Sequence, residues 1–74
     1  MMQWELFDPA DAGYKKDIIE RLMRARKEGV STGKIIRASR NVLTYRIIYD
    51  ALGAKLMPKS VWDSINSALR KLGY

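Results

Sequence analysis

Apolar side chains recur at helical spacing in four separate segments, and this pattern limits the chain to a helical fold. The segments are residues 14–27, 31–40, 44–52 and 60–72. In each of them apolar residues return every three or four positions, as one face of an amphipathic helix requires. A chain of 74 residues has room for one domain. We therefore expect an all-α fold, a compact bundle of four to five helices.

Residues that favour helix ends separate these segments. Gly29 and Gly53 are expected to end the first and third helices, and Ser31 is a good N-cap for the second. Asn41 lies where the chain must turn sharply, and asparagine tolerates a positive φ better than most residues. Pro58 precedes the last helix. The order predicts a helix-turn-helix followed by a supporting helix.

The apolar stripes also predict the core. We expect it to contain Tyr14, Ile18, Ile19, Leu22, Met23, Ile35, Ile36, Leu43, Ile47, Ile48, Ala51, Leu52, Val61, Trp62, Ile65, Ala68, Leu69 and Leu72.

Residues 1–13 are expected to form an extended N-terminal arm, and residues 14–74 the helical domain. Asp8-Pro9 and Gly13 argue against a helix through the whole arm, where large apolar residues occupy both alternating phases. The segment suits either an arm laid on the core or a short strand used between subunits. The arm and the last helix are the two expected surfaces for a homodimer.

The chain has no cysteine and no histidine. Disulfides, the usual zinc sites, cysteine nucleophiles and Ser-His triads are therefore excluded. Gly29 and Gly33 lack the rest of a phosphate-binding loop pattern. We expect no enzyme activity, no cofactor, no metal and no small-molecule substrate. Without an apolar run of about 18 residues or the features of a signal peptide, a cytoplasmic protein with no membrane partner is expected.

Positive charge is concentrated in the middle of the chain. Residues 24–59 carry nine basic and two acidic side chains, a net charge of +7, whereas residues 1–23 carry −2 and residues 60–74 carry +1. The electrostatic field of such a positive region attracts polyanions and raises the rate at which they bind. Nucleic acid is therefore a candidate partner, and a generic basic surface is the alternative.

The chain also resembles a known family, the lambda-repressor and Cro-like helix-turn-helix domains, over residues 16–72. The resemblance lies in Val30-Ser31, Ile35-Ile36, Leu43-Thr44, Ile47-Ile48, Leu52-Gly53, Pro58-Lys59-Ser60, Ile65 and Ala68-Leu69. Members of that family are four- or five-helix bundles of phages, plasmids and bacteria, and their third helix enters the major groove. The resemblance implies a small transcription regulator that binds double-stranded DNA, commonly as a dimer on pseudo-palindromic sites.

On this interpretation the third helix reads bases and its surroundings contact phosphates. The expected base-reading residues are Thr44, Tyr45, Arg46 and Tyr49, with Arg46 placed to bond guanine O6 and N7. The expected phosphate contacts are Ser31, Thr32, Lys34, Arg37, Arg40, Asn41, Lys55 and Lys59.

Two other functions use the same surface. Tyr45, Arg46 and Tyr49 also suit a protein-protein interaction module, an anti-repressor or adaptor, because interfaces favour aromatic residues and arginine. RNA binding, with bases stacked on the two tyrosines, is the third hypothesis.

Overall fold

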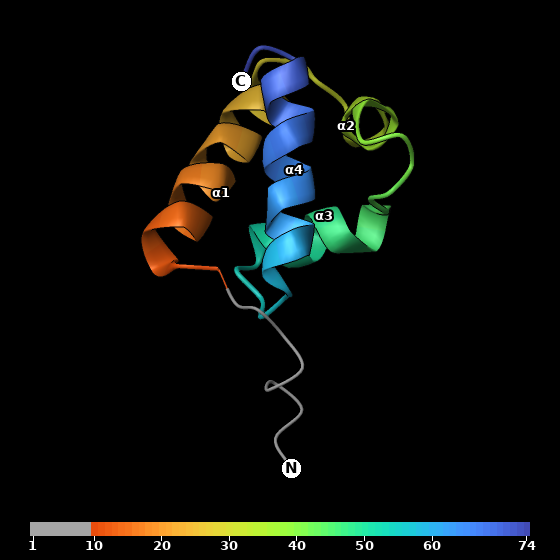
Figure 1. Cartoon of the computed structure of the whole chain (residues 1–74). Coiled ribbons are helices and arrows are strands. Elements are labelled where there is room, and N and C mark those ends of the chain that lie inside the picture. Colours follow the sequence, from red (N-terminus) through yellow and green to blue (C-terminus); the bar gives the residue numbers. More distant parts are fainter. Residues whose placement is uncertain (1–9) are drawn as a thin grey trace.

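The computed structural model describes residues 10–74, and this part of the chain forms four helices and no strand (Figure 1). Helix α1 spans Ala12–Lys27, α2 Thr32–Ala38, α3 Tyr45–Leu52 and α4 Lys59–Lys71. The all-α fold is confirmed, and the four helices coincide with the four apolar segments. Residues 1–9 of the predicted arm lie outside the described residues. Ala12 and Gly13, which the sequence assigns to the arm, belong to α1 instead, because Asp11 caps this helix and accepts a hydrogen bond from the Gly13 N–H at 2.9 Å.

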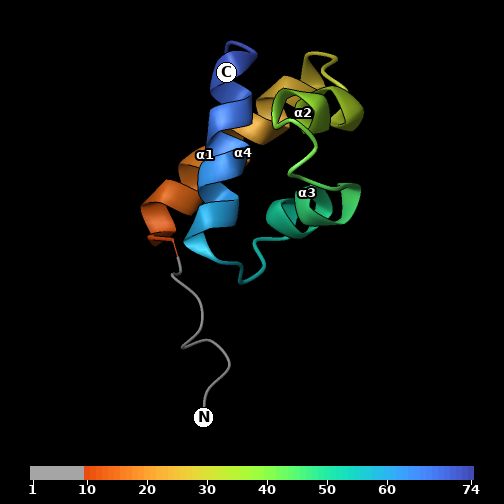
Figure 2. The same cartoon turned by 45° about the vertical axis from the view of Figure 1, so that its right-hand side comes forward.

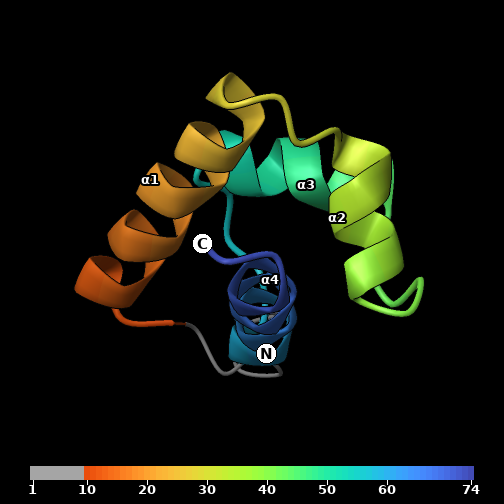
Figure 3. The ribbon, with the colours of Figure 1, turned by 90° about the horizontal axis from the view of Figure 1, so that it is seen from above.

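The other three helices are arranged around α4. Seen along α4, the helices α1, α3 and α2 form an arc around it (Figure 3). Helix α4 packs against α1 and α2, and α3 packs against the same two helices. Figure 2 shows α2 and α3 one above the other, joined by the turn of residues 39–44. None of the helices in residues 10–74 has the length and hydropathy needed to cross a membrane.

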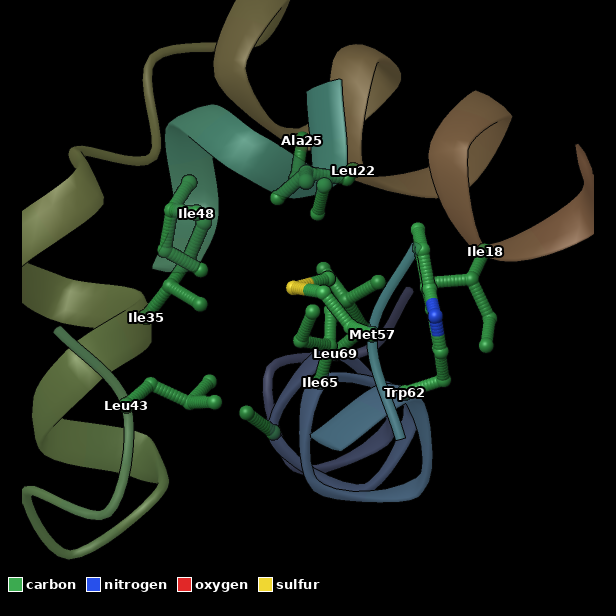
Figure 4. Packing of buried hydrophobic residues seen from close by; sticks show 12 residues of the cluster. Ile18, Leu22, Ala25, Ile35, Leu43, Ile48, Met57, Trp62, Ile65 and Leu69 are labelled. Atoms are coloured by element: carbon green, nitrogen blue, oxygen red, sulfur yellow. The ribbon is translucent and has the colours of Figure 1, made fainter. Parts of the chain in front are cut away.

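The core consists of 12 side chains that meet between these helices (Figure 4). They are Ile18, Leu22, Ala25, Ile35, Leu43, Ile48, Ala51, Met57, Trp62, Ile65, Ala68 and Leu69. The side chains labelled in Figure 4 converge from α1, α2, α3, the turn before α3 and, with Met57, the segment before α4 toward Trp62, Ile65 and Leu69 of α4. Most of the predicted core is confirmed.

Met23 is the clear exception, because the prediction of a core position is wrong for this residue. Its side chain is 57% exposed. The buried stripe of α1 runs through Ile18, Leu22 and Ala25, at spacings of four and three. Met23 lies one position beyond Leu22, about 100° around the helix axis, and therefore faces outward.

All four helices end in the same hydrogen-bonded turn. In each, the residue after the cap has a positive φ, and the next N–H donates to a carbonyl in the last helical turn. Glycine occupies this left-handed position after α1 and α4, as Gly29 (φ 100°) and Gly73 (φ 89°). After α2 and α3 the position is held by Arg40 (φ 58°) and Ala54 (φ 55°). The two helices of the predicted helix-turn-helix thus end on residues that disfavour this conformation.

The backbone angles at Asn41 and Gly53 test the predictions for the turns after α2 and α3. The positive φ expected at Asn41 is confirmed, at 63°, and it follows the positive φ of Arg40. Gly53 does occupy the cap of α3, but with φ −85°, and the left-handed residue is Ala54.

Replacing Ala54 with glycine is expected to stabilise the fold by about 0.5–1 kcal/mol, because glycine adopts a positive φ without the steric cost of a Cβ. Urea denaturation of the parent and of Ala54→Gly measures this difference. Gly29→Ala is the matched reverse change, since a Cβ there meets no atom within 4 Å and the effect is confined to the backbone. It should destabilise by about 1 kcal/mol. A loss of stability in Ala54→Gly contradicts the left-handed geometry.

Candidate nucleic-acid interface

The outer face of α3 presents three of the four predicted base-reading side chains. Tyr45 is 57% exposed, Tyr49 is 55% exposed, and the side chain of Arg46 is 90% exposed. The opposite face of the helix carries the buried Ile48 and Ala51. The strong separation of apolar and polar residues around α3 therefore forces these three side chains to the surface.

Thr44, the fourth of these residues, caps α3. Its hydroxyl oxygen accepts a hydrogen bond from the Ile47 N–H at 3.2 Å. This bond satisfies one of the free N–H groups of the first turn and fixes where the helix begins. Thr44 is exposed and directly precedes Tyr45 and Arg46 in the chain.

Tyr45 connects this surface to the start of α2. A Cβ built on Gly33 would lie 3.1 Å from the Tyr45 hydroxyl oxygen, so the tyrosine ring reaches the first turn of α2. That turn is capped by Ser31, whose hydroxyl accepts a hydrogen bond from the Lys34 N–H at 3.1 Å. Ser31 and Lys34 are exposed beside it, whereas Thr32 is buried and its side chain is withdrawn from the surface. The fold thus brings the start of α2 and the start of α3 together.

Gly33→Ala is expected to stabilise the chain by about 0.5–1 kcal/mol, because alanine is the better helix former. The new methyl group crowds only the Tyr45 hydroxyl, the far end of an exposed side chain that can move aside. Urea denaturation gives the stability, and the Tyr45 amide shift reports the displaced ring. In a Tyr45→Phe background the crowding atom is absent, so the gain should be at least as large. A loss of stability in both backgrounds contradicts this account.

Arg46 has one weak partner on its own helix. Its Nε lies 4.0 Å from Asp50 Oδ2, one turn further along α3. At this distance and exposure the ion pair contributes little to stability. The terminal guanidinium nitrogens of Arg46 have no hydrogen-bond partner among residues 10–74 and face solvent. They remain as donors for a ligand.

Arg26 joins this surface from α1, and sequence reasoning did not select it as a binding residue. Its guanidinium carbon lies 5.7 Å from the centroid of the Tyr49 ring, which is cation–π distance. The contact places the basic end of α1, which also carries Arg24 and Lys27, next to α3. Arg26 and Tyr49 are 23 positions apart, so no local pattern predicts their contact.

The remaining phosphate candidates are distributed over several places. Arg37, Asn41 and Lys55 are exposed at the end of α2, in the turn and after α3. Arg40 lines a cavity of about 210 Å³ between the end of α2 and α4, together with Lys71. It therefore lies toward α4 and away from the start of α2.

Lys59 is held on the α1–α4 side of the molecule. Its Nζ lies 3.1 Å from Asp63 Oδ2 and 5.5 Å from the centroid of the Tyr14 ring. The Tyr14 hydroxyl also donates to Asp63, at 2.6 Å. These hydrogen bonds from Tyr14 and Lys59 lower the pKa of Asp63, so its carboxylate is ionised at neutral pH and holds the ammonium group. The structure does not group Lys59 with the residues around α3.

Comparisons of the chain with models of protein families, with curated proteins and with solved structures find no match. The resemblance to lambda-repressor and Cro-like domains therefore stays a prediction. Within residues 10–74, the surface best suited to a ligand is the face made by Ser31, Lys34, Thr44, Tyr45, Arg46, Tyr49 and Arg26, which we call the α3 face.

Proposed function

We propose that this chain binds double-stranded DNA through the α3 face, as a small transcription regulator of a phage, plasmid or bacterium. The observation that carries the proposal is the exposure of Tyr45, Arg46 and Tyr49 on one side of α3, between basic groups of α1 and α2. Helix α3 would lie in the major groove, with α2 crossing the phosphate backbone.

The dimensions and chemistry of α3 support this arrangement. A helix with its side chains is about 10–12 Å wide, and the major groove is about 12 Å wide. Arg46 extends freely from the first turn of α3 and keeps donors for a bidentate contact with guanine O6 and N7. Tyr45 and Tyr49 would contact phosphate oxygens or thymine methyl groups.

The flanks of α3 supply the positioning contacts. At the start of α2, Ser31 and Lys34 are exposed, and Lys34 adds a positive charge. Phosphates bind well at such helix starts. On the other flank, the Arg26 guanidinium over Tyr49 would contact the backbone of the opposite strand. Contacts of this kind fix the register of the protein on DNA without reading its sequence.

One observation favours a second function, binding of a protein partner on the same face. Val42 is exposed in the turn before α3, close in sequence to the exposed Tyr45, Arg46 and Tyr49. Apolar and aromatic side chains around an arginine are also what protein interfaces select. A stoichiometric complex that resists salt would support this alternative.

An amide chemical-shift titration with a mixed-sequence duplex, at low and moderate salt, tests the proposal. We expect shifts at residues 31–50 and at Arg26 that weaken steeply with salt, because phosphate contacts dominate non-specific binding. Polyphosphate is the matched control, since it carries the charge without a groove and should shift basic residues over the whole surface. No shifts with duplex, or the same scattered shifts with both ligands, would contradict the α3 face. A preference for single strands would favour RNA.

A further inference from the structure

The outer face of α1, away from the core, carries an apolar side chain and an apolar groove. Met23, in the C-terminal half of the helix, is 57% exposed. About two turns earlier along α1 lies a groove of about 460 Å³ with a mostly apolar lining. Its walls are Ala12, Lys15, Lys16, Ile19, Glu20 and, from the segment after α3, Ala54. Ala12, Lys16, Ile19 and Met23 recur at spacings of three or four and therefore share one stripe of the helix.

The middle of this stripe carries one basic and one acidic side chain, Lys16 and Glu20, while Lys27 lies at its C-terminal end and Lys15 on the wall of the groove. Lys16 and Glu20 are both exposed, and neither forms an ion pair with another residue in the range 10–74. Residues 24–59 by contrast carry a net charge of +7, which repels a second copy of the same chain. Lys16 and Glu20 are thus the place on the stripe where two copies of a basic chain can form attractive pairs.

We propose that this stripe is the contact between two copies of the chain, with the two α1 helices packed antiparallel about a two-fold axis. If the two-fold axis passes at the level of Ile18, Lys16 of one copy lies opposite Glu20 of the other. The symmetry forms this ion pair twice, once with each copy supplying the lysine. Met23 then lies five residues, about 7.5 Å, beyond the axis. That is the level of Gly13 in the other copy, at the end of the groove that Ala12, Lys16 and Ile19 line.

Each element of the stripe thus has a role in the pairing. The flexible Met23 side chain fills an irregular apolar groove on the other copy, for which methionine is well suited. The two Lys16–Glu20 pairs favour antiparallel packing of the two α1 helices. Parallel packing would place each side chain opposite its own copy, and therefore like charges opposite each other. One helical stripe is a small contact area, so we expect weak association. Tyr45 and Arg46 lie on α3 and are not part of the stripe.

Sedimentation equilibrium of the full chain without DNA tests this contact. The mean mass of the parent should rise from 8.5 kDa toward twice that value as the concentration approaches about 1 mM. Lys16→Glu and Glu20→Lys should each raise the dissociation constant at least about tenfold, because each replaces two attractive pairs by two repulsive ones. The double variant restores both pairs and should return to within about threefold of the parent. Met23→Gln should weaken association while keeping the side-chain length.

These substitutions are at exposed helical positions, and thermal melting confirms that each variant is folded. Arg70→Glu on α4 is the matched control, because it changes the net charge as Lys16→Glu does but lies outside the stripe. It should not weaken association. A mass of 8.5 kDa at every concentration overturns the proposal, and so does a dimer that Lys16→Glu leaves unchanged. Neither result depends on DNA, so the test is independent of the proposed function.

Discussion

Replacing Trp62 with alanine is expected to leave most molecules unfolded at room temperature. Trp62 is fully buried and is the largest such side chain in the core. Truncation of a buried tryptophan costs about 3–5 kcal/mol, from lost apolar burial and from the cavity left behind. A domain of this size has a total stability of about that magnitude, so little margin would remain. Far-UV circular dichroism against temperature measures the loss, and a melting temperature near that of the parent would show that α4 is not packed this way.

Trp62→Phe is the matched control for this experiment. The buried Trp62 Nε1 has no hydrogen-bond acceptor among residues 10–74, and phenylalanine removes this unsatisfied donor. It also keeps an aromatic ring under Lys15, whose Nζ lies 5.4 Å from the centroid of the indole. The smaller ring leaves a small cavity, which offsets the gain. We expect a cost below about 2 kcal/mol, well under that of alanine.

Much of the fold was accessible from the sequence because its determinants are local. Apolar residues at helical spacing located all four helices, and Ser31, Thr44 and Gly29 mark helix ends through bonds within a few residues. Helix α2 ends at Ala38, two residues before the predicted Arg40. The reason is also local, since Arg40 has a positive φ that cannot continue a helix.

The parts that were missed depend on contacts between distant segments. Met57 is buried in the loop before α4, where no periodicity marks it as core. The contact between Arg26 and Tyr49 exists only because α1 packs on α3. Likewise, a count of basic residues cannot reveal that Lys59 is held by Asp63 next to Tyr14 of α1.

Arg46→Ala is expected to weaken binding to a DNA site selected by the parent by about 1–3 kcal/mol, or roughly fivefold to 150-fold, while leaving helical content unchanged. The substitution should not affect folding, because the Arg46 side chain is 90% exposed and its one ion pair, with Asp50, is weak. The substitution should weaken DNA binding, because Arg46 extends from the first turn of α3, and the first turn of a helix in the major groove contacts the bases. Fluorescence anisotropy with a duplex selected from a random library gives the dissociation constants.

Two further variants separate the loss of charge from the loss of a base contact. Arg70→Ala removes the same charge from the exposed face of α4, so it should lower affinity only slightly and equally for all sequences. Arg46→Lys keeps the charge but not the planar pair of donors, so it should retain non-specific binding while losing preference for the selected site. If Arg46→Ala binds the selected duplex as tightly as the parent at the same salt, Arg46 does not read bases. In that case α3 does not enter the major groove in the orientation proposed, and the α3 face is better explained as a contact for another protein.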